Sequence, residues 1–277
     1  MDKVNVLFAT DKNYLPYLEC SLKSLLAHNE NLSVFVLNTG DIPLDWAENL
    51  QPYFAQRRSE LKLCYLNQAS LNHFEDNGYI SKATYLRYYI EDLFQYVSTP
   101  YWIYLDCDIA INGDITLPFK PLKASKYAIA AVSDPYVNSI ADHPYKHQDY
   151  FNAGILYFEA NRCRGIKTDL IKLTEHLKNQ IIFGDQDILN VYFQDNWLKL
   201  DNLSNFQLDH ILYKKQTIGG GKTAPYILHF TGPNKPLGNV SSSDENVRAV
   251  IALFRAYHQL SWDNIVNLPL GSIKLTL

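Results

Sequence analysis

The start of the chain alternates between short apolar runs and stretches in which apolar residues recur at helical spacing. The apolar runs predict three buried strands, at residues 4–9, 33–38 and 61–66. Residues 15–27, with leucines at helical spacing, and residues 43–54, with a proline near the first turn, predict helices between these strands. This order of strands and helices is typical of a parallel sheet covered by helices.

A fourth apolar and aromatic run, residues 101–108, contains two carboxylates at its end, Asp106 and Asp108. We expect it to form a buried strand that leads into a loop. Residues i and i+2 of a strand project to the same side, so the two carboxylates can point at one place. They repel each other unless a cation or a proton lies between them, and oxygen ligands suit Mg²⁺ or Mn²⁺. Taken alone, the D-x-D pattern favours a solvated loop with two unrelated acids.

The rest of the chain continues the mixture of strands and helices. Residues 134–150 form a long, polar, irregular segment of the kind that often serves as a lid or binding loop. The Asn-Ala-Gly entry to the next strand, residues 152–154, is small enough for a ligand to approach the backbone. Gly184 and Asp185 can cap the helix that follows, and Asp185 can be a cap, a ligand or both. The expected strands are 127–132, 151–158 and 197–200, the expected helices are 79–94, 169–178 and 247–260, and residues 114–119 are expected to be extended.

Several polar residues follow predicted strands directly. In parallel α/β sheets, ligands bind beyond the carboxyl ends of the strands. Asp11, Asn13 and Tyr14 come after the first strand, which makes them candidate binding residues on topology alone. His229 ends another apolar strand, and Lys235 lies in the glycine- and proline-containing loop after it. The first turn has neither G-x-G-x-x-G nor a P-loop lysine motif, so neither a standard dinucleotide site nor a P-loop is supported.

Composition narrows the class of protein. The 277 residues carry a formal net charge of −4 without a run of Lys or Arg, which argues against nucleic-acid binding. The four cysteines include no C-x-x-C pair, so zinc and redox motifs are not expected and a reducing compartment fits. We expect no signal peptide, and no apolar run reaches the ~18 residues of a membrane span. We therefore expect a cytoplasmic protein, with weak peripheral association with the inner face of the cell membrane left open.

Six short motifs, taken together and in order, resemble the family 8 glycosyltransferases, retaining enzymes that include bacterial lipooligosaccharide galactosyltransferases and the glycogenins. The motifs are FATDKNY (8–14), TYLR (84–87), YLDCD (104–108), FNAG (151–154), DQDILN (185–190) and HFTGPNKP (229–236). The resemblance covers roughly residues 4–237. It implies an α/β protein with the GT-A fold, in which a Rossmann-like, mainly parallel central sheet has helices on both faces. It also implies a catalytic domain at residues 1–240, with a carboxy-terminal helix and tail at 241–277.

The resemblance further implies roles for individual residues. Asp106, Asp108 and His229 would hold Mn²⁺ or Mg²⁺, which bridges the two phosphates of UDP-galactose or UDP-glucose. The other donor-binding positions are Asp11, Asn13 and Tyr14 at the uridine, Gly232 and Lys235 at the diphosphate, Arg87, Asn152, Ala153, Asp185 and Gln186 around the sugar, and Ala9, Thr10 and Cys107 beside them. Leu237 stands where the family often has Trp, and Gly184 where some relatives carry a polar side chain. These two differences from the family affect the expectation of how the acceptor is bound, but not the expectation of how the donor is bound.

We therefore expect a retaining hexosyltransferase of bacterial polysaccharide or lipopolysaccharide synthesis, which moves galactose or glucose from a UDP-sugar to a saccharide or glycolipid acceptor. Gln186 is the expected side chain beneath the anomeric carbon. Because an amide is a poor nucleophile, same-face substitution is favoured over a covalent intermediate on Asp185. The alternatives are a metal-dependent phosphohydrolase or nucleotidyltransferase, an inactive UDP-sugar-binding module, and a glycogenin-like self-glucosylating protein. The first would leave the His229-to-Lys235 loop unexplained.

Overall fold

The computed structural model of the chain describes residues 3–71, 74, 82–145, 149–194, 196–212, 224–232, 235–240 and 242–274. The strands are β1 (Val4–Ala9), β2 (Leu32–Asn38), β3 (Glu60–Tyr65), β4 (Tyr101–Leu105), β5 (Ile109–Ile111), β6 (Ile129–Ala131), β7 (Ile155–Glu159), β8 (Leu198–Lys199), β9 (Phe206–Gln207) and β10 (Ile227–His229). The α-helices are α1 (Leu15–His28), α2 (Leu44–Gln56), α3 (Ile90–Leu93), α4 (Phe119–Lys123), α5 (Ile166–Leu177), α6 (Asp185–Phe193), α7 (Leu208–Leu212), α8 (Glu245–Gln259) and α9 (Trp262–Asn267). Short 3₁₀ helices are η1 (Lys12–Tyr14), η2 (Gln68–Leu71), η3 (Lys82–Tyr89), η4 (Phe94–Tyr96), η5 (Val137–Ser139), η6 (Ala160–Arg162) and η7 (Asn202–Ser204). Among these described helices, none combines the length and the apolar character that crossing a bilayer requires.

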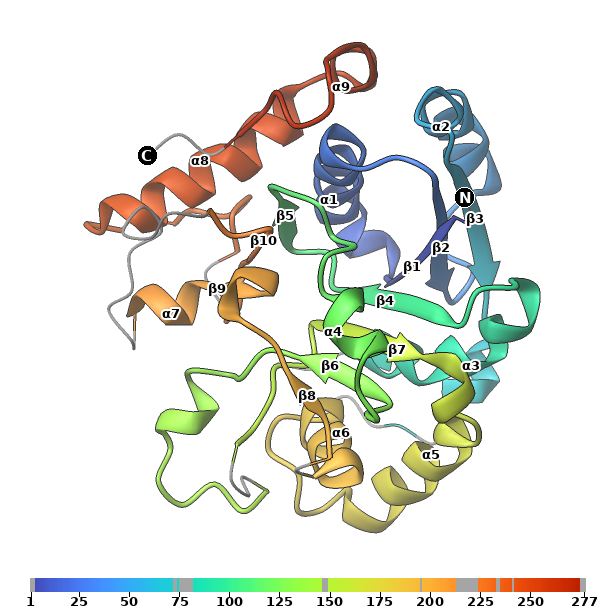
Figure 1. Cartoon of the computed structure of the whole chain (residues 1–277), viewed down its shortest axis with the longest axis vertical. Helices are drawn as coiled ribbons and strands as arrows, with labels where there is room; N and C mark the ends of the chain where they lie inside the picture. The colour runs from blue at the N-terminus through green and yellow to red at the C-terminus, as the bar shows by residue number, and fades with distance from the viewer. Residues whose placement is uncertain are drawn as a thin grey trace.

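The central sheet has seven strands in the order β3-β2-β1-β4-β7-β6-β8 (Figure 1). β1 pairs in parallel with β2 and β4, and β2 pairs in parallel with β3. These four strands therefore end at one edge of the sheet, which brings together the residues that follow β1 and β4. β7 is antiparallel to β4 and β6, and β8 is parallel to β6. The predicted α/β architecture with a mainly parallel central sheet is confirmed.

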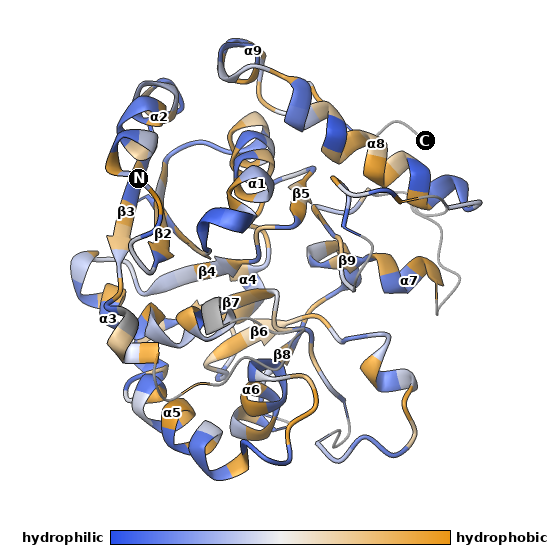
Figure 2. Cartoon of the chain, turned by 180° about the vertical axis from the view of Figure 1, so that it is seen from behind, coloured by the Kyte–Doolittle hydropathy of each residue, from blue (hydrophilic) through white to orange (hydrophobic). Residues whose placement is uncertain are grey.

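Side chains that alternate along the strands give this sheet an apolar surface on both faces. Val6 and Ile103 lie in one core with residues of α1, α2, α8 and α9. Their neighbours Leu7 and Trp102 lie in a second core with residues of α5 and α6. Figure 2 shows the matching amphipathic pattern on the covering helices, with hydrophobic and hydrophilic residues interleaved along α5 and α8.

The segment after residue 241 packs on the α1 face of the sheet. Phe254 of α8 belongs to the same core as α1. Lys23 of α1 donates a hydrogen bond from Nζ to the carbonyl oxygen of Leu260 at the end of α8, at 2.7 Å. Arg57 Nη2 donates in the same way to the carbonyl oxygen of Ile265 in α9, at 2.9 Å. Cations placed at these helix ends satisfy carbonyl groups that the helices leave unpaired, so they hold α8 and α9 on the sheet.

Two predicted strands have different bounds in the structure. The strand expected at residues 101–108 ends at Leu105. The Asp106 N–H still donates to the carbonyl oxygen of Gly154, at 2.8 Å, and the chain then enters β5 of a second sheet. The strand expected at 151–158 begins only at Ile155 and runs to Glu159. The D-x-D pair therefore lies in the link between two sheets rather than within a strand.

Two other predicted elements differ in type. Residues 114–119 were expected to be extended, but they form turns that lead into α4. The described part of the helix expected at 79–94 is mostly 3₁₀, and residues 79–81 lie outside the described residues. Arg87 Nε donates to the carbonyl oxygen of Thr84 at 3.1 Å, an acceptor that an α-helical N–H would otherwise use.

The second sheet has three strands in the order β5-β10-β9, and the sequence pattern did not predict β5, β9, α7 or α9. β10 runs antiparallel to β5, so that His229 lies opposite Ile109. Ile109 directly follows Asp108. This pairing therefore carries the imidazole of a distant segment to the D-x-D carboxylates.

Candidate active site

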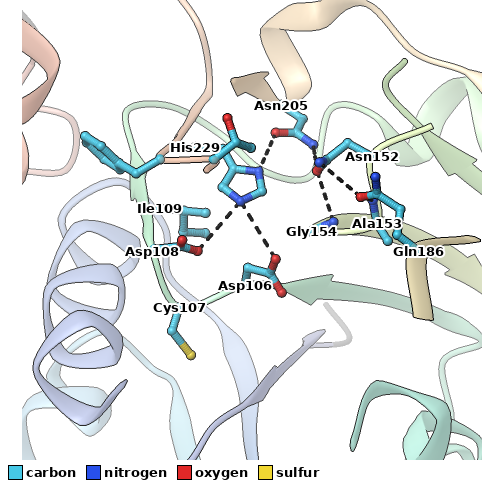
Figure 3. Close-up of polar contacts among 12 residues, drawn as sticks. Asp106, Cys107, Asp108, Ile109, Asn152, Ala153, Gly154, Gln186, Asn205 and His229 are labelled. Carbon is cyan, nitrogen blue, oxygen red and sulfur yellow. Dashed lines mark hydrogen bonds and ion pairs between the residues drawn. The ribbon is translucent and has the colours of Figure 1, made fainter. Parts of the chain in front are cut away.

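Asp106, Asp108 and His229 form a cluster at the edge where the two sheets meet (Figure 3). His229 Nε2 lies 3.8 Å from Asp106 Oδ2 and 3.6 Å from Asp108 Oδ1, and one ligand atom from each residue falls within 4.8 Å of the others. Asp108 and His229 are buried, while Asp106 is partly exposed. Two carboxylates and one imidazole are a donor set that fits Mn²⁺ or Mg²⁺.

Gly154 forms the floor of this cluster. A Cβ atom at this position would lie 2.6 Å from Asp106 Oδ2 and closer still to the imidazole ring of His229. Real Cβ atoms essentially never come so near, so only glycine leaves room for the two side chains to converge. The sequence predicted that a ligand could approach the Asn-Ala-Gly segment, which stays a prediction; in the structure, the side chains of Asp106 and His229 approach Gly154.

Lys235 neutralises one side of the cluster. Its Nζ donates to Asp108 Oδ2 and to the carbonyl oxygen of Phe230, the latter at 3.0 Å. Burial alone would raise the pKa of Asp108, but the pKa lies well below its usual range, with the adjacent positive charge of Lys235 as the main cause of the lowering. Asp108 is therefore ionised and ready to serve as a cation ligand at neutral pH.

Arg87 joins the cluster to the acid at the start of α6. It is buried, and its guanidinium lies 3.2 Å from Asp106 Oδ1 through Nη2 and 2.8 Å from Asp185 Oδ2 through Nε. Nη1 donates to the carbonyl oxygen of Ala153 at 2.5 Å. Tyr104 supports the same group, because its ring lies 4.6 Å from the guanidinium carbon and its hydroxyl donates to Asp106 Oδ1 at 2.7 Å. One cation thus aligns two carboxylates and a backbone carbonyl.

Asp185 is not a side-chain cap of α6. The N-cap position is Gly184, with φ of 58°, and no side chain caps the helix there. Asp185 is instead the first helical residue, with 2% of its surface exposed, and it pairs with Arg87. Burial raises the pKa of Asp185 to about 7, although Arg87 acts in the opposite direction.

We predict that Asp185→Asn flattens the dependence of stability on pH. The folded protein holds the Asp185 proton up to about pH 7, whereas the ordinary carboxyl pKa is 3.8. Between these values the folded state binds more protons than the unfolded chain, so stability falls as the pH rises. Urea unfolding at pH 5 and pH 8 should show a drop that is roughly 2–3 kcal/mol smaller in the variant. Asp45→Asn, at an exposed position of α2, is the control, and an equal drop in both variants would contradict the prediction.

Gln186, Asn152 and Asp134 form an amide–carboxylate network beside Arg87. Gln186 Oε1 accepts from the Ala153 N–H at 2.9 Å, and its Nε2 donates to Asp134 Oδ2 at 3.2 Å. Asn152 Nδ2 donates to the same carboxylate oxygen at 3.1 Å. Asp134 was not among the predicted site residues. Its signal in the sequence was its place directly after a predicted strand, at the start of the irregular segment 134–150.

The cluster borders a pocket of about 210 Å³, which lies between it and the residues that follow β1. Its lining residues are Ala9, Thr10, Asp11, Tyr14, Thr84, Arg87, Tyr104, Asp106, Cys107, Asp108 and Lys235. Asp11 Oδ1 accepts from the N–H groups of Asn13 and Tyr14, at 2.8 and 3.2 Å, and so shapes η1. Tyr14 is 39% exposed and packs on Tyr17, with ring centroids 5.1 Å apart. Nine of the predicted donor residues therefore line this pocket. The predicted residues that do not line it are Asn13, Asn152, Ala153, Asp185, Gln186, His229 and Gly232.

A larger hollow of about 540 Å³ lies along α8, away from the cluster. Its lining residues are Val240, Ser242, Arg248, Ile251, Ala252, Arg255, Ala256 and Gln259. None of these lining residues has a carboxylate or an imidazole.

The described part of segment 134–150 is tied to the body of the protein. The Asp134 N–H donates to the carbonyl oxygen of Tyr150 at 2.8 Å, which closes the segment at its base. His143 is 5% exposed and stacks on Phe183, with ring centroids 5.4 Å apart. Residues 146–148 lie outside the described residues, as do residues 233 and 234 of the Lys235 loop.

Solved structures place the fold in a known class. The crystal structure of the glycosyltransferase GlyE of Streptococcus pneumoniae TIGR4 matches with a TM-score of 0.76 at 28% identity, covering 96% of this chain and 63% of that one. The galactosyltransferase LgtC, solved in complex with donor and acceptor sugar analogs, matches with a TM-score of 0.75, covering 92% of this chain and 95% of that one. At 22% identity, the likeness to LgtC concerns the fold alone. The fold is that of the GT-A glycosyltransferases.

The family model described as Glycosyl transferase family 8 matches residues 5–238, and the chain belongs to this family. The resemblance inferred from the six motifs is confirmed. The glycosyltransferases GlyF and GlyE of Streptococcus pneumoniae serotype 4 are 27% and 29% identical, over 94% and 95% of this chain. The chain spans 63% and 62% of the length of these two relatives. General stress protein A of Bacillus subtilis is 28% identical over 84% of this chain and 87% of its own length.

Proposed function

We propose that this protein is a retaining hexosyltransferase that moves galactose or glucose from a UDP-sugar to a saccharide or glycolipid acceptor. The observation that carries the proposal is the convergence of Asp106, Asp108 and His229 at the edge of a polar pocket that also holds Lys235. Membership of the family and the glycosyltransferase names of the relatives support sugar transfer.

The donor is proposed to lie along the pocket from η1 to α6. Tyr14 stacks on the uracil, with Asp11 and Asn13 at the same end. Tyr14 suits this role because an exposed aromatic ring at a strand end offers a face to a base. At the other end, Arg87, Asn152, Ala153, Asp185 and Gln186 surround the sugar, and their existing hydrogen bonds leave polar groups already oriented.

Departure of UDP leaves negative charge on the diphosphate. Asp106, Asp108 and His229 would hold a divalent cation, Mn²⁺ or Mg²⁺, which supplies Lewis-acid stabilisation of that charge when bound. Lys235 adds a second positive charge. Its Nζ already lies in the pocket on Asp108, and we propose that it shifts to a phosphate oxygen when the donor binds. Gly232 is proposed to give the diphosphate access to the backbone of the same loop.

Retention is proposed to arise by same-face substitution, with the leaving phosphate taking the proton of the acceptor hydroxyl. The bond from the anomeric carbon to the phosphate oxygen breaks as the bond to the acceptor oxygen forms on the same face. Gln186 stabilises the cationic sugar through its carbonyl oxygen. Asp185 is engaged with Arg87, which suits a side chain that forms hydrogen bonds with sugar hydroxyls better than one that moves to attack.

Gln186→Ala should lower the transfer rate on the order of 10²-fold while the product keeps its anomeric configuration, since the amide stabilises charge but forms no bond. NMR of the product made from an α-linked donor gives the anomer. Gln180→Ala, at an exposed position after α5, is the matched control. A β-linked product would overturn retention, and a glycosyl ester trapped on Asp185 would overturn the same-face route.

UDP release measured with and without acceptor tests the function as a whole. A hexosyltransferase releases UDP slowly from its donor alone and faster with a saccharide. A phosphohydrolase would release products other than UDP, a binding module would release nothing, and a self-glucosylating protein would gain mass. A panel of UDP-sugars with Mn²⁺ then identifies the hexose.

The proposal extends to the organisation of the chain. Residues 1–240 are proposed as the catalytic domain and residues 241–277 as a helix and tail that pack on it, as the shared core of α1 and α8 suggests. Segment 134–150 and the Lys235 loop are proposed to close over the donor and exclude water. A cytoplasmic location is proposed because a UDP-sugar donor is expected there and the four cysteines are free thiols.

A further inference from the structure

Asn205, which neither the motifs nor the spacing singled out, lies directly behind His229. It is fully buried, in the link between η7 and β9. Its Oδ1 lies 3.1 Å from His229 Nδ1, and its Nδ2 donates to Asn152 Oδ1 at 3.0 Å (Figure 3). One amide therefore connects a residue of the metal-binding cluster with a residue of the sugar-side network.

The direction of these hydrogen bonds follows from a backbone group. The Gly154 N–H can only donate, and it donates to Asn152 Oδ1 at 3.1 Å. This contact identifies that atom of Asn152 as the oxygen. Asn205 must then present its NH₂ group to Asn152 and its oxygen to His229. Facing an acceptor, His229 Nδ1 must carry the hydrogen, which makes His229 the Nδ1–H tautomer whenever it is neutral.

The opposite ring nitrogen is left with its lone pair. His229 Nε2 faces Asp106 Oδ2 and Asp108 Oδ1 at 3.8 and 3.6 Å, beyond hydrogen-bond distance. A lone pair aimed between two carboxylates is the arrangement that a divalent cation requires. Partners of this kind commonly set the tautomer and the orientation of histidine ligands.

We propose that Asn205 is a positioning residue that holds His229 as the Nδ1–H tautomer with Nε2 directed at the cation site, and that couples this site to Asn152 on the sugar side. The part of the inference that concerns the cation rests on the proposed function. The assignment of the Nδ1–H tautomer to His229 does not depend on the proposed function.

Two substitutions separate the two hydrogen bonds of Asn205. Asn205→Leu removes both, and Asn205→Asp keeps an oxygen for His229 while losing the donor to Asn152. Asn38→Leu is the matched control, because Asn38 is equally buried and makes two hydrogen bonds at the end of β2, outside the pocket. Thermal unfolding of all three variants measures the purely structural cost.

The first measurement is ¹⁵N NMR of histidine-labelled, metal-free protein at pH 8, with His229 assigned by its absence from a His229→Gln variant. The wild-type protein and Asn205→Asp should show the Nδ1–H tautomer. A wild-type His229 with the hydrogen on Nε2 would overturn the proposal without the use of any variant.

The second measurement is Mn²⁺ affinity by electron paramagnetic resonance, which needs no sugar donor. Asn205→Leu should weaken binding about 10–100-fold, the range for loss of such a partner. Asn205→Asp and Asn38→Leu should stay within about threefold of wild type, and Asn205→Asp should raise KM for the UDP-sugar because Asn152 loses a donor. Wild-type affinity in folded Asn205→Leu would overturn the role of Asn205. Failure of the wild-type protein to bind Mn²⁺ would instead refute the proposed cation site, and with it the coupling.

Discussion

Asp108→Asn is expected to remove Mn²⁺-dependent turnover of UDP-sugars, with a loss on the order of 10²–10³-fold. The side chain keeps its shape but loses the charge that faces His229 Nε2 at 3.6 Å. It also leaves Lys235 without its carboxylate partner. Asp108 is a cleaner test than Asp106, because Asp106 also receives Arg87 and Tyr104 and its replacement would disturb the sugar side.

The measurement is UDP release as a function of Mn²⁺ concentration, together with circular dichroism to show that the variant is folded. Asp114→Asn is the control, since Asp114 is an exposed carboxylate beyond β5 whose side-chain oxygen caps a turn, a role that Asn also fills. Turnover by Asp108→Asn at the wild-type rate in the presence of EDTA would remove the metal from the mechanism.

The pattern of apolar residues predicted the first three strands of the central sheet almost to the residue. β1 has the predicted bounds, and β2 and β3 begin one residue before their predicted starts. β1 and β2 lie inside a sheet with helices on both faces, so their apolar runs are continuous, whereas β3 is an edge strand and is only partly buried. Because the carboxyl ends of β1 and β4 lie at one edge of the sheet, topology brings Asp11 and Asp106 to one pocket.

Pairing between distant segments could not be predicted in this way. Lys235 contacts Asp108 across 127 positions of the chain, and His229 reaches the D-x-D pair only because β10 pairs with β5. β5 is three residues long, which is too short for a periodic signal, and the predicted strand that ends at His229 carries no sign of the strand it pairs with. The family motifs, rather than spacing or hydropathy, therefore linked His229 to Asp106 and Asp108.

Asn205 and Asp134 show the limit even more directly. Both are buried polar residues in connecting segments, and their functions depend on which polar atoms face them. A sequence lists donors and acceptors but does not show how they pair. A buried amide whose hydrogen bonds are all made fixes the positions of its neighbours, whereas an amide on the surface bonds to water and fixes nothing. The sequence alone does not show which of the two applies.

Gly154→Ala is expected to weaken Mn²⁺ binding about tenfold or more, although it adds a single methyl group. The new Cβ would meet Asp106 Oδ2 at 2.6 Å and the His229 ring at a shorter distance still, so one of these side chains must turn away. Gly154 does not have a positive φ, so alanine fits the backbone and the effect is purely steric. Overpacking of this kind costs about 1–3 kcal/mol, and each 1.4 kcal/mol is a factor of ten in affinity.

The control for this variant is Gly113→Ala, whose Cβ would lie 3.0 Å from Tyr226 Cδ1, outside the cluster. Both alanines add a tight contact, but only the one at position 154 pushes on candidate cation ligands. Titration with Mn²⁺ should therefore separate the two variants even where their thermal stabilities are alike. Wild-type Mn²⁺ affinity in Gly154→Ala would mean that Asp106 and His229 need not converge above Gly154 for the cation to bind, and the cation site would have to be sought elsewhere in the pocket.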